Sequence, residues 1–494
     1  MARKRYRKDM RGQVYLFPPS AEEWVPEDHI VFFIRDLMNE LDLGSIEALI
    51  HEKDPRGERP YDPYVMLGII LLGYCLGIYS SRKLEQATIN QVAFRVIAGG
   101  SHPHFTTINT FRKTHRTAIS ALFLGVLLMC KKAGLVKLGH VAVDGTKIKA
   151  DASRHKAKSY ERFTAEEQAL MERIQQMLER SERVDQDEDE KFGEGKREFD
   201  LPKELARKQG RLEKIRELKA EMEADAKKAR AEELRRQAQE QRRKAEEEKQ
   251  NEAEAKRKLT RARQAEEKAR ALDPGEGRDD DEPPAPPTTL PRRKTRTTPE
   301  GKPHPKAQKS PTDPDSHLMK ASNGGFEQAY NCQAVVDGHC QIIIAADVTD
   351  HPNDAHNLLP MLHQATDNCG RPPAQATADA GYWNQDVQAE AEKLGTKVLV
   401  ALKRESRKKT GTSSPESIAA RRRMAEALAD PENKKAYAKR KAIVEPPFGH
   451  IKDARGFRQF SFRGCDAVRA EWRLVAACHN ILKLFGAMRA AQST

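Results

Sequence analysis

Apolar residues recur at the helical period through the first quarter of the chain. Residues 65–72 are apolar nearly all round a helix that Pro63 opens, which predicts a deeply buried helix. A second helix is expected over 81–97 and a third over 106–128. We therefore expect residues 1–135 to form an all-α N-terminal domain.

The third of these helices carries basic residues soon after a short turn. Arg112 and Lys113 are the first of them. A helix, a short turn and a second helix with a basic face is an arrangement that reads DNA. An ordinary helical hairpin with a basic solvent face has the same pattern, so both interpretations stay open. Under the first, the domain binds DNA ends, and Arg112 and Lys113 contact the DNA.

A highly charged segment lies in the middle of the chain. More than half of the residues in 201–272 are charged, and neither Gly nor Pro occurs in 211–273. Apolar residues in 205–222 fit a short coiled-coil seam, and those in 170–178 could pack back against it. After this seam large apolar residues nearly vanish, which favours one solvated helix held by i,i+4 pairs. We expect 158–272 to be a charged helical arm.

A segment rich in Pro, Thr and basic residues follows the arm. Its composition predicts a disordered linker over 273–316. Removing 158–316 leaves enough ordinary sequence for a globular core. The arm and the linker are therefore expected to interrupt one folded unit, made of 136–157 and 317–494.

Strand patterns occur on both sides of the interruption. Apolar residues at 141–143 end at Asp144, and those at 376–378 end at Asp379. Asp337-Gly338 separates two apolar runs, which indicates a hairpin. A further strand is expected over 397–402, with helices over 355–366, 385–394, 440–452 and 467–488. Such alternation predicts an α/β core with a mixed sheet and flanking helices.

Composition narrows the possible functions. The 494 residues carry a formal net charge of +13, which favours a polyanionic partner such as nucleic acid, although a soluble protein can be basic without one. No apolar run reaches the roughly 18 residues of a membrane span. The seven cysteines show neither zinc-type spacing nor a disulfide framework. We expect a reducing, cytoplasmic compartment, with the protein on the nucleoid when it binds DNA.

Three carboxylates are candidates for metal chemistry. Asp144 and Asp379 follow apolar strands, where α/β sheets place ligands, although Asp-Gly is also a common turn. Glu445 lies on a basic helix, where a lone Glu is usually a salt-bridge partner. If the three converge, they suit Mg²⁺, and two such ions can activate a water or a 3′-hydroxyl against a phosphodiester. A second polar cluster, 347–356, is either another metal site or a loop and helix cap.

Several motifs in order resemble one family. The sequence is similar to the DDE transposases of bacterial insertion sequences, in the branch with an N-terminal helical domain and a long insertion after the first catalytic strand. The residues around the three acids carry this resemblance, together with the segments 59–63, 80–85, 105–112, 313–320 and 326–337. It covers roughly 50–150 and 313–490 and does not inform the charged arm.

The resemblance implies an RNase H-like catalytic core in which Asp144, Asp379 and Glu445 are the three catalytic acids and metal ligands. Two Mg²⁺ ions, with Mn²⁺ as a substitute, are the implied cofactors. Around Glu445 the family has a signature of Tyr, a basic residue and Lys. The residues that match it are Tyr437, either Arg440 or Lys441, and Lys452, and they are implied DNA contacts.

The function that this resemblance implies is DNA transposition. The enzyme would bind the terminal inverted repeats of its element, cleave there and transfer the 3′-hydroxyl ends to target DNA, as a homodimer in the paired-end complex. One alternative is a metal-dependent nuclease or resolvase on the same core, without strand transfer. Another is a basic, coiled-coil DNA-binding protein whose acids are structural.

Overall fold

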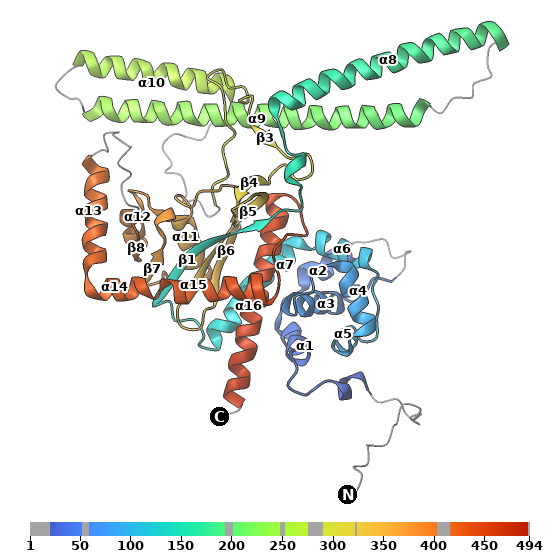
Figure 1. Cartoon of the computed structure of the whole chain (residues 1–494). Coiled ribbons are helices and arrows are strands. Elements are labelled where there is room, and N and C mark those ends of the chain that lie inside the picture. The colour runs from blue at the N-terminus through green and yellow to red at the C-terminus, as the bar shows by residue number, and fades with distance from the viewer. Residues whose placement is uncertain are drawn as a thin grey trace, which may run out of the picture.

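The computed structural model describes residues 20–51, 59–192, 201–247, 252–274, 290–321, 324–402 and 415–492. A central mixed sheet, a group of N-terminal helices and a long helical arm make up these parts (Figure 1). None of the described helices is long and apolar enough to cross a membrane. The seven cysteines are free thiols, and six of them are buried.

The sheet combines antiparallel and parallel strands. Its strands are β1 (His140–Lys149), β4 (His317–Lys320), β5 (Phe326–Asp337), β6 (Ile343–Thr349), β7 (Gln375–Ala378) and β8 (Lys397–Val400). The predicted hairpin is present, because β5 and β6 pair antiparallel, and β5 pairs antiparallel with β1 on its other side. β1 then pairs in parallel with β7, and β7 with β8. The predicted mixed sheet is therefore confirmed.

Helices from the second half of the chain pack around this sheet. They are α11 (Leu358–Cys369), α12 (Val387–Lys393), α13 (Pro415–Ala429), α14 (Pro431–Ala438), α15 (Arg440–Gly449) and α16 (Cys465–Gln492). α15 packs beside β1 and continues into a π-helical turn, His450–Ala454, while α16 packs against β6. The helices predicted for this half are all present, although α11 begins three residues later than expected.

Two prolines lie inside α15. Pro446 has no N–H to give to the carbonyl oxygen of Ala442, four residues earlier. The side-chain Nε2 of Gln341 donates to that oxygen instead, at 3.0 Å. Gln341 adopts a positive φ of 59° in the β5–β6 connection, and its carbonyl oxygen lies 3.0 Å from Nε2 of His479 on α16. One side chain thus stabilises α15 and ties it to the core.

The N-terminal helices largely follow the predicted pattern. They are α1 (Ile30–Glu40), α2 (Gly44–His51), α3 (Pro63–Cys75), α4 (Ser81–Asn90), α5 (Val92–Ile97), α6 (Phe105–Thr114) and α7 (Arg116–Lys132). α3 is capped by Asp62 and is buried from Met66 onward, as its apolar pattern predicts. The second and third predicted helices are each divided in two, at Gln91 and at His115. α6 is capped by His104, whose side chain accepts a hydrogen bond from the backbone N–H of Thr106.

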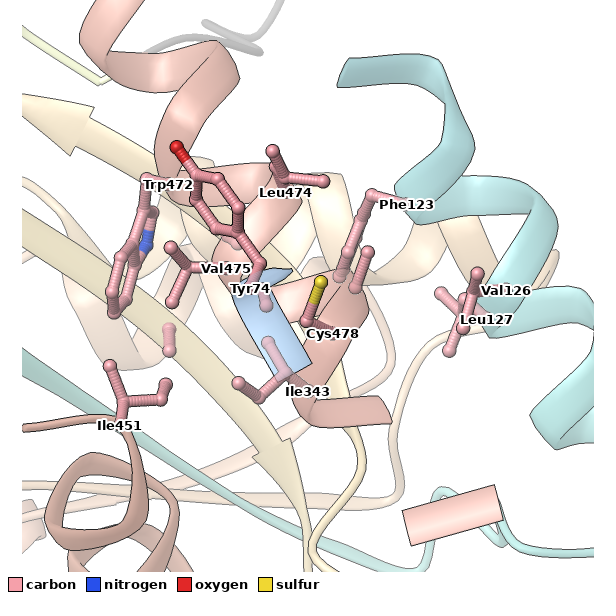
Figure 2. Close-up of a cluster of buried hydrophobic side chains, with 14 of the residues drawn as sticks. Tyr74, Phe123, Val126, Leu127, Ile343, Ile451, Trp472, Leu474, Val475 and Cys478 are labelled. Carbon is pink, nitrogen blue, oxygen red and sulfur yellow. The ribbon is translucent and has the colours of Figure 1, made fainter. Parts of the chain in front are cut away.

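A continuous hydrophobic core joins these helices to the sheet. α16 contacts both α3 and α7 on one side and β6 on the other. Figure 2 shows Tyr74 of α3 and Phe123 of α7 beside Trp472, Val475 and Cys478 of α16. The Tyr74 hydroxyl donates to Glu471 Oε1 at 2.8 Å within this core. The helical part is therefore packed directly on the sheet-bearing part.

The arm consists of three antiparallel helices, α8 (Tyr160–Phe192), α9 (Leu201–Glu247) and α10 (Glu252–Leu272) (Figure 1). The seam predicted between 170–178 and 205–222 is present, because Leu170 packs with Leu212, Ile215 and Met222. At its base the short strands β2 (Lys158–Ser159) and β3 (Gln308–Lys309) pair antiparallel. The sequence predicts a turn between the first two helices over 183–200, but α8 continues to Phe192, and 193–200 lie outside the described residues.

Beyond residue 222 the arm differs from the prediction. We expected one solvated helix without a seam, but the chain reverses between α9 and α10, which pack together. Ala231, Leu234 and Ala269 are buried where they meet. Small side chains let two helices approach closely, so alanine forms a seam here that a search for large apolar residues overlooks. Ion pairs across the interface, such as Arg242 with Glu266 at 2.8 Å, add to it.

The linker also differs from the prediction. Residues 290–316 were expected to be disordered, but they follow the base of the arm with defined contacts. Leu290 and Ala307 are buried, and the backbone N–H of Arg293 donates to Asp350 Oδ1 at 2.7 Å. The remainder of the predicted linker, 275–289, lies outside the described residues.

Candidate active site

The register of the parallel strands brings two of the predicted acids together. The β1–β7 ladder ends at the pair Val143 and Ala378, so Asp144 and Asp379 are the next residues on neighbouring strands. Asp379 ends its strand as predicted. Asp144 does not, because β1 continues for five more residues along β5. Its position at the end of the parallel ladder, rather than at the end of a strand, puts it beside Asp379.

Asp144 accepts two hydrogen bonds in a half-buried position. Gly145 N donates to Oδ1 at 2.8 Å, and Arg440 Nη1 donates to Oδ2 at 3.2 Å. Burial raises the pKa of Asp144, and the charge of Asp379 raises it further, while Gly145 and Arg440 oppose this. A carboxylate with a raised pKa beside another acid favours a positively charged ligand.

Asp379 is held by the turn that follows β7. It caps a short 3₁₀ helix, Ala380–Tyr382, and its Oδ1 accepts a hydrogen bond from Gly381 N at 2.7 Å. A Cβ on Gly381 would lie 2.8 Å from that same oxygen. Glycine at this position therefore lets the carboxylate reach the backbone N–H without a clash.

The third predicted acid, Glu445, lies on α15 and is exposed. α15 packs beside β1, the strand that carries Asp144. Within the described ranges, no group of three His, Cys, Asp or Glu side chains is arranged to hold a metal ion. The structure thus places Asp144 and Asp379 on neighbouring strands and Glu445 on a helix beside β1, and the three do not form a closed metal-binding group.

The signature residues around Glu445 take different positions. Arg440 is nearly buried and contacts Asp144, whereas Lys441 is exposed. Tyr437 hydrogen-bonds with Arg440, and burial raises the pKa of its hydroxyl. Lys452 Nζ donates to Thr146 Oγ1 on β1 at 2.6 Å. Of the two candidate basic residues, Arg440 is the one that faces the acids.

A polar network lies near the acids and joins Asp354, from the second polar cluster, to partners that were not predicted. Asp354 Oδ1 accepts hydrogen bonds from Asn331 Nδ2 at 2.6 Å and from Gln333 Nε2 at 2.8 Å, and Lys147 Nζ lies 3.7 Å away. Tyr382, buried beside Asp379, donates its hydroxyl proton to Gln333 Oε1. Amide side chains inside the otherwise apolar strand β5 were the signal in the sequence that could have revealed this network.

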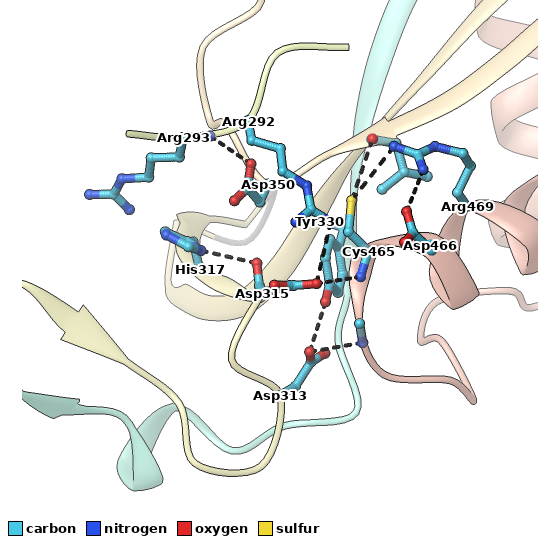
Figure 3. Close-up of polar contacts among 12 residues, drawn as sticks. Arg292, Arg293, Asp313, Asp315, His317, Tyr330, Asp350, Cys465, Asp466 and Arg469 are labelled. Carbon is cyan, nitrogen blue, oxygen red and sulfur yellow. Dashed lines mark hydrogen bonds and ion pairs between the residues drawn. The ribbon is translucent and has the colours of Figure 1, made fainter. Parts of the chain in front are cut away.

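The second polar cluster, 347–356, is structural in the described chain. Asp347 pairs with Arg469 at 2.5 Å, and Asp350 accepts from the backbone of Arg293. Figure 3 shows Asp350 and Arg469 among the polar contacts that connect residues 290–316, which were predicted to be a linker, to α16. Because Asp347 and Asp350 are engaged by Arg469 and by a backbone N–H, their contacts favour the loop interpretation over a second metal site.

Arg112, which was predicted to contact DNA, is buried in the structure. Its side chain is 3% exposed, its Nη1 donates to the carbonyl oxygen of Tyr79 at 2.8 Å, and its guanidinium lies 5.0 Å from the ring centre of Phe462. Burial therefore excludes Arg112 as a DNA contact in this fold. Lys113, the next residue, is exposed, so its predicted contact with DNA stays a prediction.

The donor chemistry of the acid pair fits a hard divalent cation. Two carboxylates on adjacent strands offer the oxygen ligands that such ions prefer. The nearby Arg440 guanidinium shows that this position already accommodates positive charge, since it bonds to Asp144.

Two protein families match parts of the chain. The family described as "Transposase DDE domain" matches residues 287–481, which include Asp379 and Glu445 but not Asp144. The family described as "Transposase domain (DUF772)" matches residues 19–114, the N-terminal helices. No curated protein and no solved structure matches the chain. Both matches are to transposase domains typical of bacterial insertion-sequence transposases, and together they cover more than half of the sequence.

Proposed function

We propose that this transposase binds the ends of its own element, cleaves one phosphodiester at each end and joins the freed 3′-hydroxyl to target DNA. The observation that carries the proposal is the pairing of Asp144 with Asp379 at the end of the parallel ladder. DDE transposases act on DNA with divalent metal ions, and two adjacent carboxylates are the groups that such chemistry requires.

The order of the strands supports an RNase H-like core. Three antiparallel strands, β6, β5 and β1, are followed by the parallel strands β7 and β8. In this arrangement the catalytic acids come from the central strand and from its parallel neighbour. The order of the strands thus agrees with the fold that the family implies.

In the proposed enzyme, Asp144, Asp379 and Glu445 hold two Mg²⁺ ions, with Mn²⁺ as a substitute. Bound there, the ions would activate a water or a 3′-hydroxyl and stabilise the leaving oxygen. Glu445 is exposed on α15, so its side chain can turn towards the acid pair without giving up a buried position. Arg440 orients Asp144 through their hydrogen bond, which keeps the carboxylate directed into the site.

DNA contacts are assigned to the basic side chains near the acids and on the N-terminal helices. Lys441 and Lys113 are exposed. Tyr437 lies in α14, just before the helix that carries Glu445, and Lys452 lies in the π-helical turn just after that helix. Lys and Arg at such positions neutralise phosphates and make the affinity salt-dependent. The N-terminal helices would recognise the element ends.

The arm is assigned to pairing of two subunits at the two element ends. Its seams hold it as a rod-like extension that a second subunit or a second DNA end can reach. Deleting 165–272 should then prevent the homodimer in the paired-end complex. An unchanged oligomeric state and unchanged end binding would remove the arm from this role.

Cleavage of a labelled duplex that carries the gene's flanking ends tests the chemistry. Wild-type protein with Mg²⁺ should nick the duplex at the element end, whereas Asp144→Asn and Asp379→Asn should bind it without nicking. Asp151→Asn is the matched control, because Asp151 is a carboxylate close in sequence that pairs with Arg463 at 2.8 Å, outside the site. Undiminished nicking by Asp144→Asn and Asp379→Asn would contradict the assignment of the acids.

A further inference from the structure

A basic segment crosses the base of the arm. We call residues 290–309 the strap; it carries seven Lys or Arg residues and one acidic residue. Three of its cations are held by acids. Lys309 pairs with Glu221 at 2.9 Å, and Lys294 pairs with Glu232 at 2.7 Å. Arg292 pairs with Asp315 at 3.5 Å (Figure 3). These pairs fix the strap against α9 and against the residues just before β4.

Three other cations of the strap have no acid partner among the described residues. Arg293, Arg296 and Lys306 are exposed and line one cavity of about 380 Å³. Figure 3 shows the Arg293 guanidinium directed away from Asp350, although its backbone N–H bonds that carboxylate. Burial and the charge of Arg296 lower the pKa of Arg293, while the charge of Asp350 opposes them, so Arg293 lies close to a second cation as well as to one acid.

The lining of this cavity, which we call the strap cavity, is basic throughout. Besides the three unpaired cations it includes Lys294, Lys309 and His317, and none of its lining residues is acidic. The acids that pair with Lys294 and Lys309 come from α9 and line an adjoining cavity on the arm side, which also includes Arg293 and Asp350. The acids therefore lie on the arm side, and the lining of the strap cavity itself carries an excess of positive charge, which favours binding of an anion.

A third cavity adjoins the strap cavity towards the sheet. It measures about 470 Å³ and shares Gln328 with the strap cavity. Its charged lining consists of the basic residues Lys149, Arg154, Lys156 and Arg463 and the acids Asp151 and Glu327. Lys149 ends β1, five residues beyond Asp144. At about 3.4 Å per residue this is roughly 17 Å along the strand. Duplex DNA advances about 3.4 Å per base pair, so the spacing corresponds to about five base pairs.

We propose that the strap cavity binds backbone phosphates of the element-end duplex, with Arg293, Arg296 and Lys306 as the contacts, about five base pairs or more from the cleaved bond. The inference rests on the proposed function for the identity of the DNA. An extended polyanion is favoured over a small free phosphate because the three cations are exposed and because a second basic cavity adjoins theirs.

Salt-dependent binding tests the strap cavity independently of catalysis. Full-length protein carrying Arg293→Gln, Arg296→Gln and Lys306→Gln is compared with wild type on a labelled end duplex, without divalent metal. The control removes three exposed lysines at the opposite end of the sheet, by Lys132→Gln, Lys393→Gln and Lys397→Gln. Each lost phosphate contact should reduce the slope of log K against log salt by about 0.9.

The strap variant should therefore lose about two to three units of slope and about 100-fold in affinity at 0.15 M salt, whereas the control should keep the wild-type slope. Adding Lys306→Arg in place of Lys306→Gln should restore part of the loss. Equal slopes in all three proteins would overturn the proposal. Pyrophosphate binding that is lost in the strap variant while the slope for DNA is unchanged would also overturn it, in favour of a small anion.

The two proposals fail in different ways. If wild type cleaves the end duplex but the strap variant binds it normally, the strap assignment is wrong and the transposase assignment stands. If the strap variant loses binding but wild type never cleaves with metal, the phosphate site stands and the proposed chemistry is wrong.

Discussion

At the scale of single residues, short-range contacts determine which groups can act on a substrate. Asp144 and Asp379 each accept a hydrogen bond from a backbone N–H one or two residues later, which orients both carboxylates without a bulky neighbour. Arg112 and Lys113 are adjacent in sequence, yet one is buried and the other is exposed. Their roles must therefore be tested separately.

Arg112→Gln should lower the free energy of unfolding by about 2–3 kcal/mol, because the buried carbonyl oxygen of Tyr79 loses its donor. Lys113→Gln should change stability by less than about 0.5 kcal/mol, as surface substitutions usually do. It should instead weaken binding to the end duplex. Urea unfolding and DNA titration of both variants separate the effects. A stable Arg112→Gln protein with impaired DNA binding would contradict the structural role.

His479 should make the protein sensitive to acid. Burial lowers its pKa in the folded chain to about 3, against an ordinary value near 6.5. Between these values the unfolded chain binds the proton and the folded chain does not, so stability falls as the pH falls. From pH 7 to pH 5 the loss due to His479 should be about 2 kcal/mol.

Urea unfolding at the two pH values measures this loss. In His479→Gln the same change of pH should cost about 2 kcal/mol less, because glutamine does not titrate. The other titrating groups are common to both proteins and cancel in the comparison. An identical loss in both proteins would show that His479 titrates normally in the folded state.

At the scale of elements, the sheet could be predicted from sequence and the arm only in part. Apolar runs that end at Asp144 and Asp379 mark buried strands, but their pairing depends on a register that no local pattern contains. In the arm, leucine, isoleucine and methionine revealed the first seam. The second seam uses alanine, whose small side chain gives little hydrophobic signal, so α9 and α10 were read as one helix. Residues 290–309 were assigned to disorder because the contacts that order them come from distant acids.

Because alanine side chains form the contact between α9 and α10, a larger side chain there should destabilise the packing of these two helices. Ala269→Leu should force α10 away from α9, at a cost of about 1–3 kcal/mol confined to the arm. Hydrogen exchange should then become faster in α10 and remain unchanged in the sheet. Ala253→Leu, at an exposed position of the same helix, is the control. Equal exchange in both variants would mean that α10 does not pack on α9 through Ala269.

At the scale of the whole molecule, α16 connects the two parts that the family comparisons match. It contacts the N-terminal helices and β6 through one hydrophobic core, so element-end recognition and chemistry would be mechanically linked. The general class of the protein could be inferred from sequence, because several motifs occur in order. The position of Glu445 relative to the acid pair could not be predicted from sequence, since it depends on how α15 packs beside β1.

Joining of a labelled element end to a plasmid is the most direct test of the account. Purified protein would be incubated with Mg²⁺, a plasmid target and labelled duplex carrying the gene's own flanking ends, with wild type beside Asp379→Ala. The account predicts that label becomes covalently attached to the plasmid through the 3′-hydroxyl with wild type and not with Asp379→Ala. Cleavage of the ends without any joined product would contradict it and indicate a nuclease, and joining by Asp379→Ala would contradict the assignment of the site.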